Sequence, residues 1–112
     1  MIMILDEKDL PMTDGKWKKL LGLPEAWVSY LDGQRHNSLG PAMINVLGLK
    51  AWYINGKRHR LDGPATEYAD GHKELWVNDV RVFRKDFPSA VISFLLGVDK
   101  ETAKIVEQEI KK

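Results

Sequence analysis

The 112-residue sequence contains no cysteine. This absence excludes disulfides, thiolate metal sites and a cysteine nucleophile, and it fits a reducing compartment. No apolar run reaches the ~20 residues that a membrane-spanning helix needs. The apolar start at residues 1–5 has no basic flank and is followed by charged residues 6–9, so we do not interpret it as a signal peptide. These absences predict a cytoplasmic protein without a transmembrane segment.

A strong net charge is also lacking. The chain carries 17 basic and 16 acidic residues, which leaves a formal net charge of +1, and no part of it is strongly basic. General binding of polyanions through charge alone is therefore not expected. The length suits one domain with one core. We predict a single domain over 1–112, with an N-terminal cover at 1–25, a repeat sheet at 26–86 and a helical cap at 87–112.

What the sequence does have is an internal repeat. Residues 30–48 recur at 53–71, an offset of 23, and a broken third copy includes Trp76, Asn78 and Arg81. A period of this size is typical of stacked supersecondary units. The residues that we assign to the structural repeat are Tyr30, Gly33, Gly40, Pro41, Gly48, Trp52, Tyr53, Gly56, Asp62, Gly63, Pro64, Gly71 and Trp76.

Short runs of strand-forming residues follow from residue 26 onward. They predict strands at about 26–31, 42–47, 49–54, 65–69 and 72–77, with a weaker sixth at 80–84. The dipeptides Asp32-Gly33, Asn55-Gly56 and Asp70-Gly71 reverse the chain between them, because Gly takes positive φ without penalty. The expected fold is β-rich (α+β), an antiparallel β-hairpin meander of about five to six strands.

The turn at Asp70-Gly71 can be predicted in more detail. A plain two-residue hairpin would place Glu67 opposite Glu74, and like charges directly opposite one another are unfavourable. A three-residue loop with Gly71 in a left-handed conformation places Glu67 opposite Lys73 instead. We therefore predict a bulged turn with positive φ at Gly71.

The two ends of the chain have helical signals. Thr13 or Asp14 can cap a short helix that carries Trp17, Leu20 and Leu21 and that Gly22 ends, and residues 2–5 can form a strand or an arm. Near the other end, residues 89–96 follow Pro88 and predict a helix that Gly97 ends. Asp99 predicts the N-cap of a second helix, from residue 100 to about 111. These two helices are expected to cover a sheet face or to cap the open edge of the meander.

The repeat resembles the MORN repeat. The likeness is carried by residues 55–59 (Asn-Gly-Lys-Arg-His), Gly63 and Asp70-Gly71, and the first copy echoes it. Where MORN units have Gly directly after the His, this chain has residues 60–63 (Arg-Leu-Asp-Gly). It is closer to the divergent W-Y-x-N-G-K-x-H-R-x-D-G-P-A repeats of uncharacterised bacterial and tailed-phage proteins. The resemblance implies a β-hairpin meander that serves as a scaffold for protein contacts, with lipid binding sometimes proposed, and it implies no catalysis.

The polar residues of the repeat loops are the candidate binding residues, and two interpretations of them remain open. In one, they form a basic ridge that binds phosphates, with aromatic residues of the repeat as stacking surfaces. In the other, the arginines pair with Asp62 or with a carboxylate of a neighbouring strand, and His59 bonds the backbone of the adjacent repeat. The candidates are Arg35, His36, Lys57, Arg58, His59 and Arg60.

Signatures of catalysis and of cofactor binding are not found. The pair His59 and Asp62 has the residue types of a base and its orienting carboxylate, but a catalytic histidine rarely needs a second copy one repeat away. His36, His59 and His72 lack metal-ligand spacing, and no phosphate-binding glycine loop is present. The sequence therefore predicts no enzyme, no catalytic residue, no metal and no cofactor.

These observations favour a non-enzymatic protein–protein interaction module that binds its partner through the sheet face or the His/Arg loops. Its expected form is a small accessory protein of a bacterium or phage that binds a host factor and inhibits or adapts it, in the cytoplasm of a bacterium or phage-infected host. The alternative is a binder of nucleic acid or anionic lipid that uses the basic loops.

Overall fold

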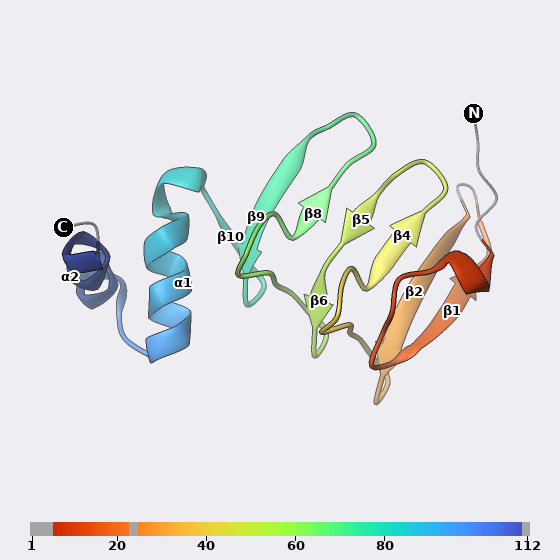
Figure 1. The fold of residues 1–112 in the computed structure, drawn as a ribbon, viewed down its shortest axis with the longest axis horizontal. Helices are drawn as coiled ribbons and strands as arrows, with labels where there is room; N and C mark the ends of the chain where they lie inside the picture. Colours follow the sequence, from red (N-terminus) through yellow and green to blue (C-terminus); the bar gives the residue numbers. More distant parts are fainter. Residues whose placement is uncertain (1–5, 23–24, 111–112) are drawn as a thin grey trace.

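The computed structural model describes residues 6–22 and 25–110, and Figure 1 shows its arrangement. Every pairing of neighbouring strands is antiparallel, as predicted. An eight-stranded sheet has the order β1-β2-β4-β5-β8-β9-β10, with β3 paired to β2, and β6 and β7 form a separate two-stranded sheet. The strands are β1 (Lys16–Leu20), β2 (Ala26–Leu31), β3 (Gln34–Arg35), β4 (Met43–Asn45), β5 (Lys50–Ala51), β6 (Tyr53–Ile54), β7 (Lys57–Arg58), β8 (Thr66–Glu67), β9 (Lys73–Val77) and β10 (Val80–Val82).

The repeat is visible as three tight hairpins with the same register. An aromatic residue of the first strand lies opposite an arginine of the second in each of them: Tyr30↔Arg35, Tyr53↔Arg58 and Trp76↔Arg81. Both residues of each two-residue turn have positive φ, which is the backbone of a type I′ hairpin. The third turn holds this conformation without any glycine, at Asn78 and Asp79.

The bulged turn at Gly71 is confirmed. Gly71 has a φ of +94°, and Glu67 lies opposite Lys73. The strand expected over 49–54 is divided in two, because β5 pairs with β4 and β8 whereas β6 pairs with β7. Trp52 stands between the two pieces, and its N–H donates to the carbonyl of Ala65.

The short helix expected to carry Trp17, Leu20 and Leu21 is wrong, because Lys16–Leu20 form the edge strand β1. It pairs residue by residue with β2, from Lys16↔Tyr30 to Leu20↔Ala26. A helix of so few residues is marginal by itself, whereas β2 offers a complete backbone ladder. The sheet consequently begins at residue 16 rather than 26. The strand or arm expected at residues 2–5 lies outside the described residues.

Two helices follow β10, as predicted. Helix α1 (Phe87–Leu96) has Pro88 in its first turn and ends at Gly97, whose φ is +68°. Helix α2 (Lys100–Ile110) begins after Asp99, whose Oδ1 accepts the Thr102 N–H at 2.7 Å. The last expected residue of this helix, at 111, lies outside the described residues. In Figure 1 the two helices stand beyond the β9–β10 end of the sheet, so they cap its edge and leave its faces uncovered.

The interior of the sheet is small. The buried hydrophobic cluster consists of Ala42, Ala51 and Tyr53, with Met43 packed against it. The described chain measures 47 × 32 × 20 Å, and its radius of gyration of 15.9 Å exceeds the ~13 Å of a compact chain of this length. The protein is therefore elongated, and much of its apolar surface stays outside a core.

Candidate functional site

Arginines and aromatic rings alternate along the hairpins. The Arg35 guanidinium lies 5.5 Å from the centre of the Tyr53 ring, and Arg58 lies 5.5 Å from Tyr53 and 4.8 Å from Trp76. We call these four residues the arginine ladder. Arg58 also donates to the Tyr53 hydroxyl at 2.9 Å and lies 3.8 Å from the Glu74 carboxylate. The Arg58 guanidinium thus interacts with Tyr53, Trp76 and Glu74.

Glu74 neutralises this end of the ladder. Its side chain is 13% exposed. Burial alone raises its pKa, but the Trp76 N–H and the charge of Arg81 outweigh that cost, and the net pKa is lowered. Glu74 is therefore an anion at neutral pH, and it faces Arg58 at 3.8 Å and Arg81 at 3.7 Å. Sequence reasoning assigned Glu74 no such role.

Arg60 is likewise paired. Its Nε donates to Asp62 at 2.9 Å, its Nη1 donates to the Pro64 carbonyl at 3.0 Å, and Glu67 lies at 3.5 Å. The guanidinium also stacks on the Trp52 ring at 4.1 Å. These carboxylate contacts of Arg58 and Arg60 are the ones that the structural interpretation of the loops expected.

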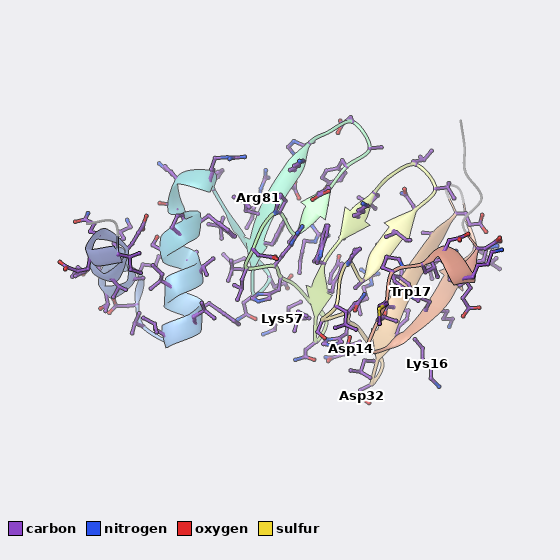
Figure 2. All side chains as sticks on the ribbon, viewed as in Figure 1. Asp14, Lys16, Trp17, Asp32, Lys57 and Arg81 are labelled. Carbon is purple, nitrogen blue, oxygen red and sulfur yellow. The ribbon has the colours of Figure 1, made fainter. Side chains whose placement is uncertain are left out.

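The other two basic candidates have no carboxylate partner among the described residues. Arg35 and Lys57 are exposed. Figure 2 shows Lys57 along the same edge of the sheet as Asp14 and Asp32. The six candidate residues are thus brought to neighbouring loops, but two of the four cations are paired with carboxylates and acidic groups share the edge with Lys57. No continuous ridge of unpaired cations is formed by the described residues.

His36 holds two segments together. Its Nδ1 accepts the N–H of Asn55 at 3.0 Å, and its Nε2 donates to Oδ2 of Asp14 at 2.8 Å. Ser38 donates to the same carboxylate from its N–H and its hydroxyl, each at 2.9 Å. These residues have the types of a hydrolytic triad, but Ser38 bonds to Asp14 rather than to His36, and both imidazole nitrogens are already occupied. The cluster is suited to holding residue 14 in place and has no free base.

His59 repeats half of this arrangement. Its Nδ1 accepts the N–H of Asn78 at 2.8 Å, which is the bond to the adjacent repeat that the structural interpretation expected. Its ring packs on Phe94 of α1 with centroids 4.6 Å apart. The resulting desolvation lowers the pKa of His59, so the neutral imidazole is favoured. The carboxylate of Asp62, which the sequence offered as its orienting partner, binds Arg60 instead.

Asp14 and Asn37 are the site residues that sequence reasoning missed. Asn37 is 2% exposed and donates from its side chain to the carbonyls of Met12 and Pro41, each at 2.9 Å. Both residues tie segment 6–15 to the first repeat loop. Asp14 precedes the matched repeat residues and Asn37 aligns with Arg60, so the 23-residue pattern contained no signal for either contact.

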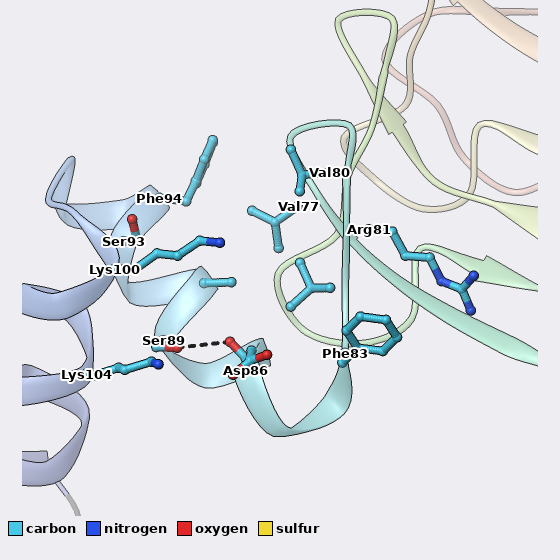
Figure 3. Close-up of a pocket in the computed structure, with 12 residues that line it drawn as sticks. Val77, Val80, Arg81, Phe83, Asp86, Ser89, Ser93, Phe94, Lys100 and Lys104 are labelled. Carbon is cyan, nitrogen blue, oxygen red and sulfur yellow. Dashed lines mark hydrogen bonds between the residues drawn. The ribbon is translucent and has the colours of Figure 1, made fainter.

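A groove of about 520 Å³ lies between the last hairpin and the two helices. Figure 3 shows Val77, Val80 and Phe83 from the hairpin side and Phe94 from α1 around it, with Lys100 and Lys104 from α2. We call it the C-terminal groove. Val80 is 60% exposed and Phe83 is 66% exposed, although both are large apolar residues. The lining carries three cations against one anion: Arg81, Lys100, Lys104 and Asp86.

Comparison with known proteins gives no match from which a function for these residues could be inferred. The chain matches no protein family, no curated protein and no solved structure. The described part of the chain contains no cluster of three or more His, Asp or Glu that could hold a metal ion. Within residues 6–22 and 25–110 no helix has the length and apolar character needed to cross a membrane.

Proposed function

We propose that this protein is a non-enzymatic module that binds another protein through the C-terminal groove. The observation that carries the proposal is the exposure of large apolar residues around this groove and on the helices beside it. Monomeric proteins rarely leave such residues gathered at one place unless they form a contact site. The exposed apolar residues of this end of the chain are Val80, Phe83, Phe94, Leu95, Leu96, Ile105 and Ile110.

The charges that line the C-terminal groove indicate which charge the bound segment of the partner should carry. Arg81 already lies 3.7 Å from Glu74. The lining charges that bear on a partner are therefore Lys100 and Lys104 against Asp86. They favour an apolar segment with acidic flanks, for which the lysines form a complementary rim. Together with the likeness to bacterial and tailed-phage repeat proteins, this supports a small accessory protein that inhibits or adapts a host factor in the bacterial cytoplasm. The repeat sheet then acts as a scaffold that holds the hairpin side of the groove.

The alternative function, binding of nucleic acid or anionic lipid through the basic loops, has less support. Arg58 and Arg60 are paired with Glu74 and Asp62, so phosphate binding has to displace carboxylates that are already in place. A gel-shift with DNA and RNA and a vesicle assay test it directly. Micromolar binding with a log–log salt slope near −0.7 to −0.9 per contact would replace the protein-binding proposal.

The test of the proposed function uses tagged full-length chain and bacterial host lysate, with quantitative mass spectrometry of captured proteins. Phe83→Asp places an anion in the groove, and Leu47→Asp is the matched control, because Leu47 is also exposed (53%) and is not part of the groove lining. We expect one protein to be captured by wild type and Leu47→Asp and lost with Phe83→Asp. The purified pair should then bind in calorimetry. Equal capture by the two variants would overturn the proposal.

A further inference from the structure

The two full copies of the repeat surround their histidines with the same backbone bonds. The N–H of His36 donates to the carbonyl of Ser29 at 2.9 Å, and that of His59 donates to the carbonyl of Trp52 at 3.0 Å. Each Nδ1 accepts a backbone N–H from the next repeat, at 3.0 and 2.8 Å. Because Nδ1 is the acceptor in both rings, a neutral His59 carries its proton on Nε2, as His36 does.

The residues after the histidines also match. The N–H groups of Asn37 and Arg60 donate to the carbonyls of Tyr53 and Trp76, at 3.0 and 3.1 Å. Both side chains donate to the carbonyl of the proline four residues further on, at 2.9 and 3.0 Å. The backbone of the second copy is therefore built to the same plan, residue by residue, as that of the first.

The copies differ in two respects that bear on this site: only the first has a carboxylate, and the hydroxyl that Ser38 donates to it has no counterpart at Leu61. In the first copy, Asp14 receives the Nε2 proton of His36 and the N–H of Ser38. The equivalent donors of the second copy are Nε2–H of His59 and the N–H of Leu61, and neither has a hydrogen-bond partner among the described residues. We call these two donors the second-repeat cradle. Asn37, which occupies the position equivalent to Asp14, turns its amide to backbone carbonyls instead.

Space for a ligand exists beside the second-repeat cradle. A cavity of about 490 Å³ is lined by Asn37, Ser38, Trp52, His59 and Leu61, among others. Phe94 packs on the His59 ring but belongs to the lining of the C-terminal groove and not to that of this cavity. Arg60 and Asp62 also line it and neutralise each other. Both donor residues thus line an open space, and the anion of this lining, Asp62, is engaged by Arg60.

We propose that the second-repeat cradle binds a carboxylate, an aspartate or glutamate side chain that a protein partner presents on a loop, as Asp14 is presented to the first copy. That the carboxylate comes from a protein partner rests on the proposed function. That the second-repeat cradle binds a carboxylate does not. The first copy shows which protonation state of the carboxylate such a site favours. The Ser38 N–H holds the pKa of Asp14 well below its usual range, so this donor set favours an ionised carboxylate.

The experiment is an NMR titration of ¹⁵N-labelled full-length protein with a blocked peptide that has the sequence of residues 11–17, P-M-T-D-G-K-W. The matched control peptide has Asn in place of Asp. We expect saturable shifts of the Leu61 amide and of the His59 ring nitrogens with the Asp peptide, and at least about ten-fold weaker binding of the Asn peptide, because its amide is not an ionised acceptor. Sodium acetate as a third ligand shows whether a free carboxylate is sufficient or a protein loop is required.

The variant Asp14→Ala gives a positive control, because it removes the natural carboxylate from the first copy. In this variant, the Ser38 amide should shift with acetate in the same direction as the Leu61 amide. A Leu61 amide that responds to none of the three ligands overturns the inference, whether or not Asp14→Ala folds. This outcome is separate from the proposed function, since the titration needs no natural partner and its readout, the Leu61 amide, is not part of the lining of the C-terminal groove.

Discussion

Nδ1 of His36 accepts the N–H of Asn55 at 3.0 Å, and Nδ1 of His59 accepts the N–H of Asn78 at 2.8 Å, one repeat later in the chain. Each bond joins the loop of one repeat to the tight turn of the next, where the backbone has positive φ. A histidine at this position thus links neighbouring hairpins, which explains why it recurs without any need for chemistry at the imidazole.

The two histidines should differ in their contribution to stability. His36 is 7% exposed and has a partner on each nitrogen, whereas His59 has one hydrogen bond and a ring contact with Phe94. We expect His36→Ala to lower the free energy of unfolding by about 3 kcal/mol and His59→Ala by about 1 kcal/mol. Urea denaturation measures both. A larger loss with His59→Ala would contradict this account of the links.

A second prediction concerns pH and Asp14. Its pKa is lowered in the folded state, chiefly by the Ser38 N–H, so between the folded and unfolded pKa values the unfolded chain binds more protons. The stabilisation is fully present above the unfolded pKa of about 4 and is lost as the pH falls toward the folded one. The difference in unfolding free energy between wild type and Asp14→Asn should therefore be constant from pH 7 to pH 5 and shrink below pH 4.

His59 changes the unfolding free energy in a different pH range from Asp14, so the two contributions can be separated. Its lowered pKa means that stability is present above about pH 6.5 and declines as the pH falls through the folded value. Asp14→Asn should show this decline just as wild type does, because it retains His59. A wild-type–variant difference that shrinks already between pH 7 and pH 5 would show that Asp14 is not held as an anion by the first repeat.

The tight turns and the bulge were predictable because their signals are local. Residue pairs such as Asn55-Gly56 favour the positive φ values of a two-residue turn. The charges of Glu67 and Lys73 favour the register in which these two residues lie opposite each other. The helices were predictable for the same reason, from Pro88, Gly97 and Asp99. These features need no knowledge of distant residues.

Strand β1 and the Asp14 contact could not be predicted in this way. The apolar residues of 17–21 have helical spacing, and only the free edge of β2 makes a strand the better solution. Asp14 meets His36 across 22 residues, in a contact that has no counterpart in the second repeat. The C-terminal groove depends on how α1 stands beside the last hairpin, which no pattern in residues 87–96 encodes.

The glycine of the bulged turn allows a third prediction. Gly71 has a φ of +94°, and a Cβ there would meet nothing within 4 Å, so any cost of substitution comes from the backbone alone. Gly71→Val should lower the unfolding free energy by more than ~1 kcal/mol, because a β-branched residue resists positive φ. Gly71→Asn should cost less, since Asn tolerates this region better. Equal losses in thermal denaturation would remove the backbone explanation.

Gly15 is required for another reason, which gives the fourth prediction. A Cβ on it would lie 2.4 Å from the carbonyl oxygen of Tyr30, a backbone atom of the neighbouring strand. Gly15→Ala should therefore cost ~2 kcal/mol or more by forcing β1 away from β2. Hydrogen exchange should quicken at residues 16–20 and remain slow in β9, where the register is unaffected. Unchanged protection of residues 16–20 would show that the strand pair absorbs the methyl group.

The final prediction rests on two buried hydroxyls with opposite surroundings. Thr66 in β8 is 2% exposed, and its Oγ1 has no hydrogen-bond partner among the described residues, whereas Ser29 is fully buried and bonded to the Thr13 hydroxyl. Thr66→Val removes an unsatisfied polar group and favours a strand, so it should raise the unfolding free energy by about 1 kcal/mol. Ser29→Ala should lower it by about the same amount, because it removes the hydroxyl–hydroxyl bond to Thr13 and leaves Thr13 Oγ1 with the Gly15 N–H alone. Chemical denaturation of the two variants beside wild type measures both signs, and a destabilising Thr66→Val would mean that its hydroxyl has a partner, such as a bound water, after all.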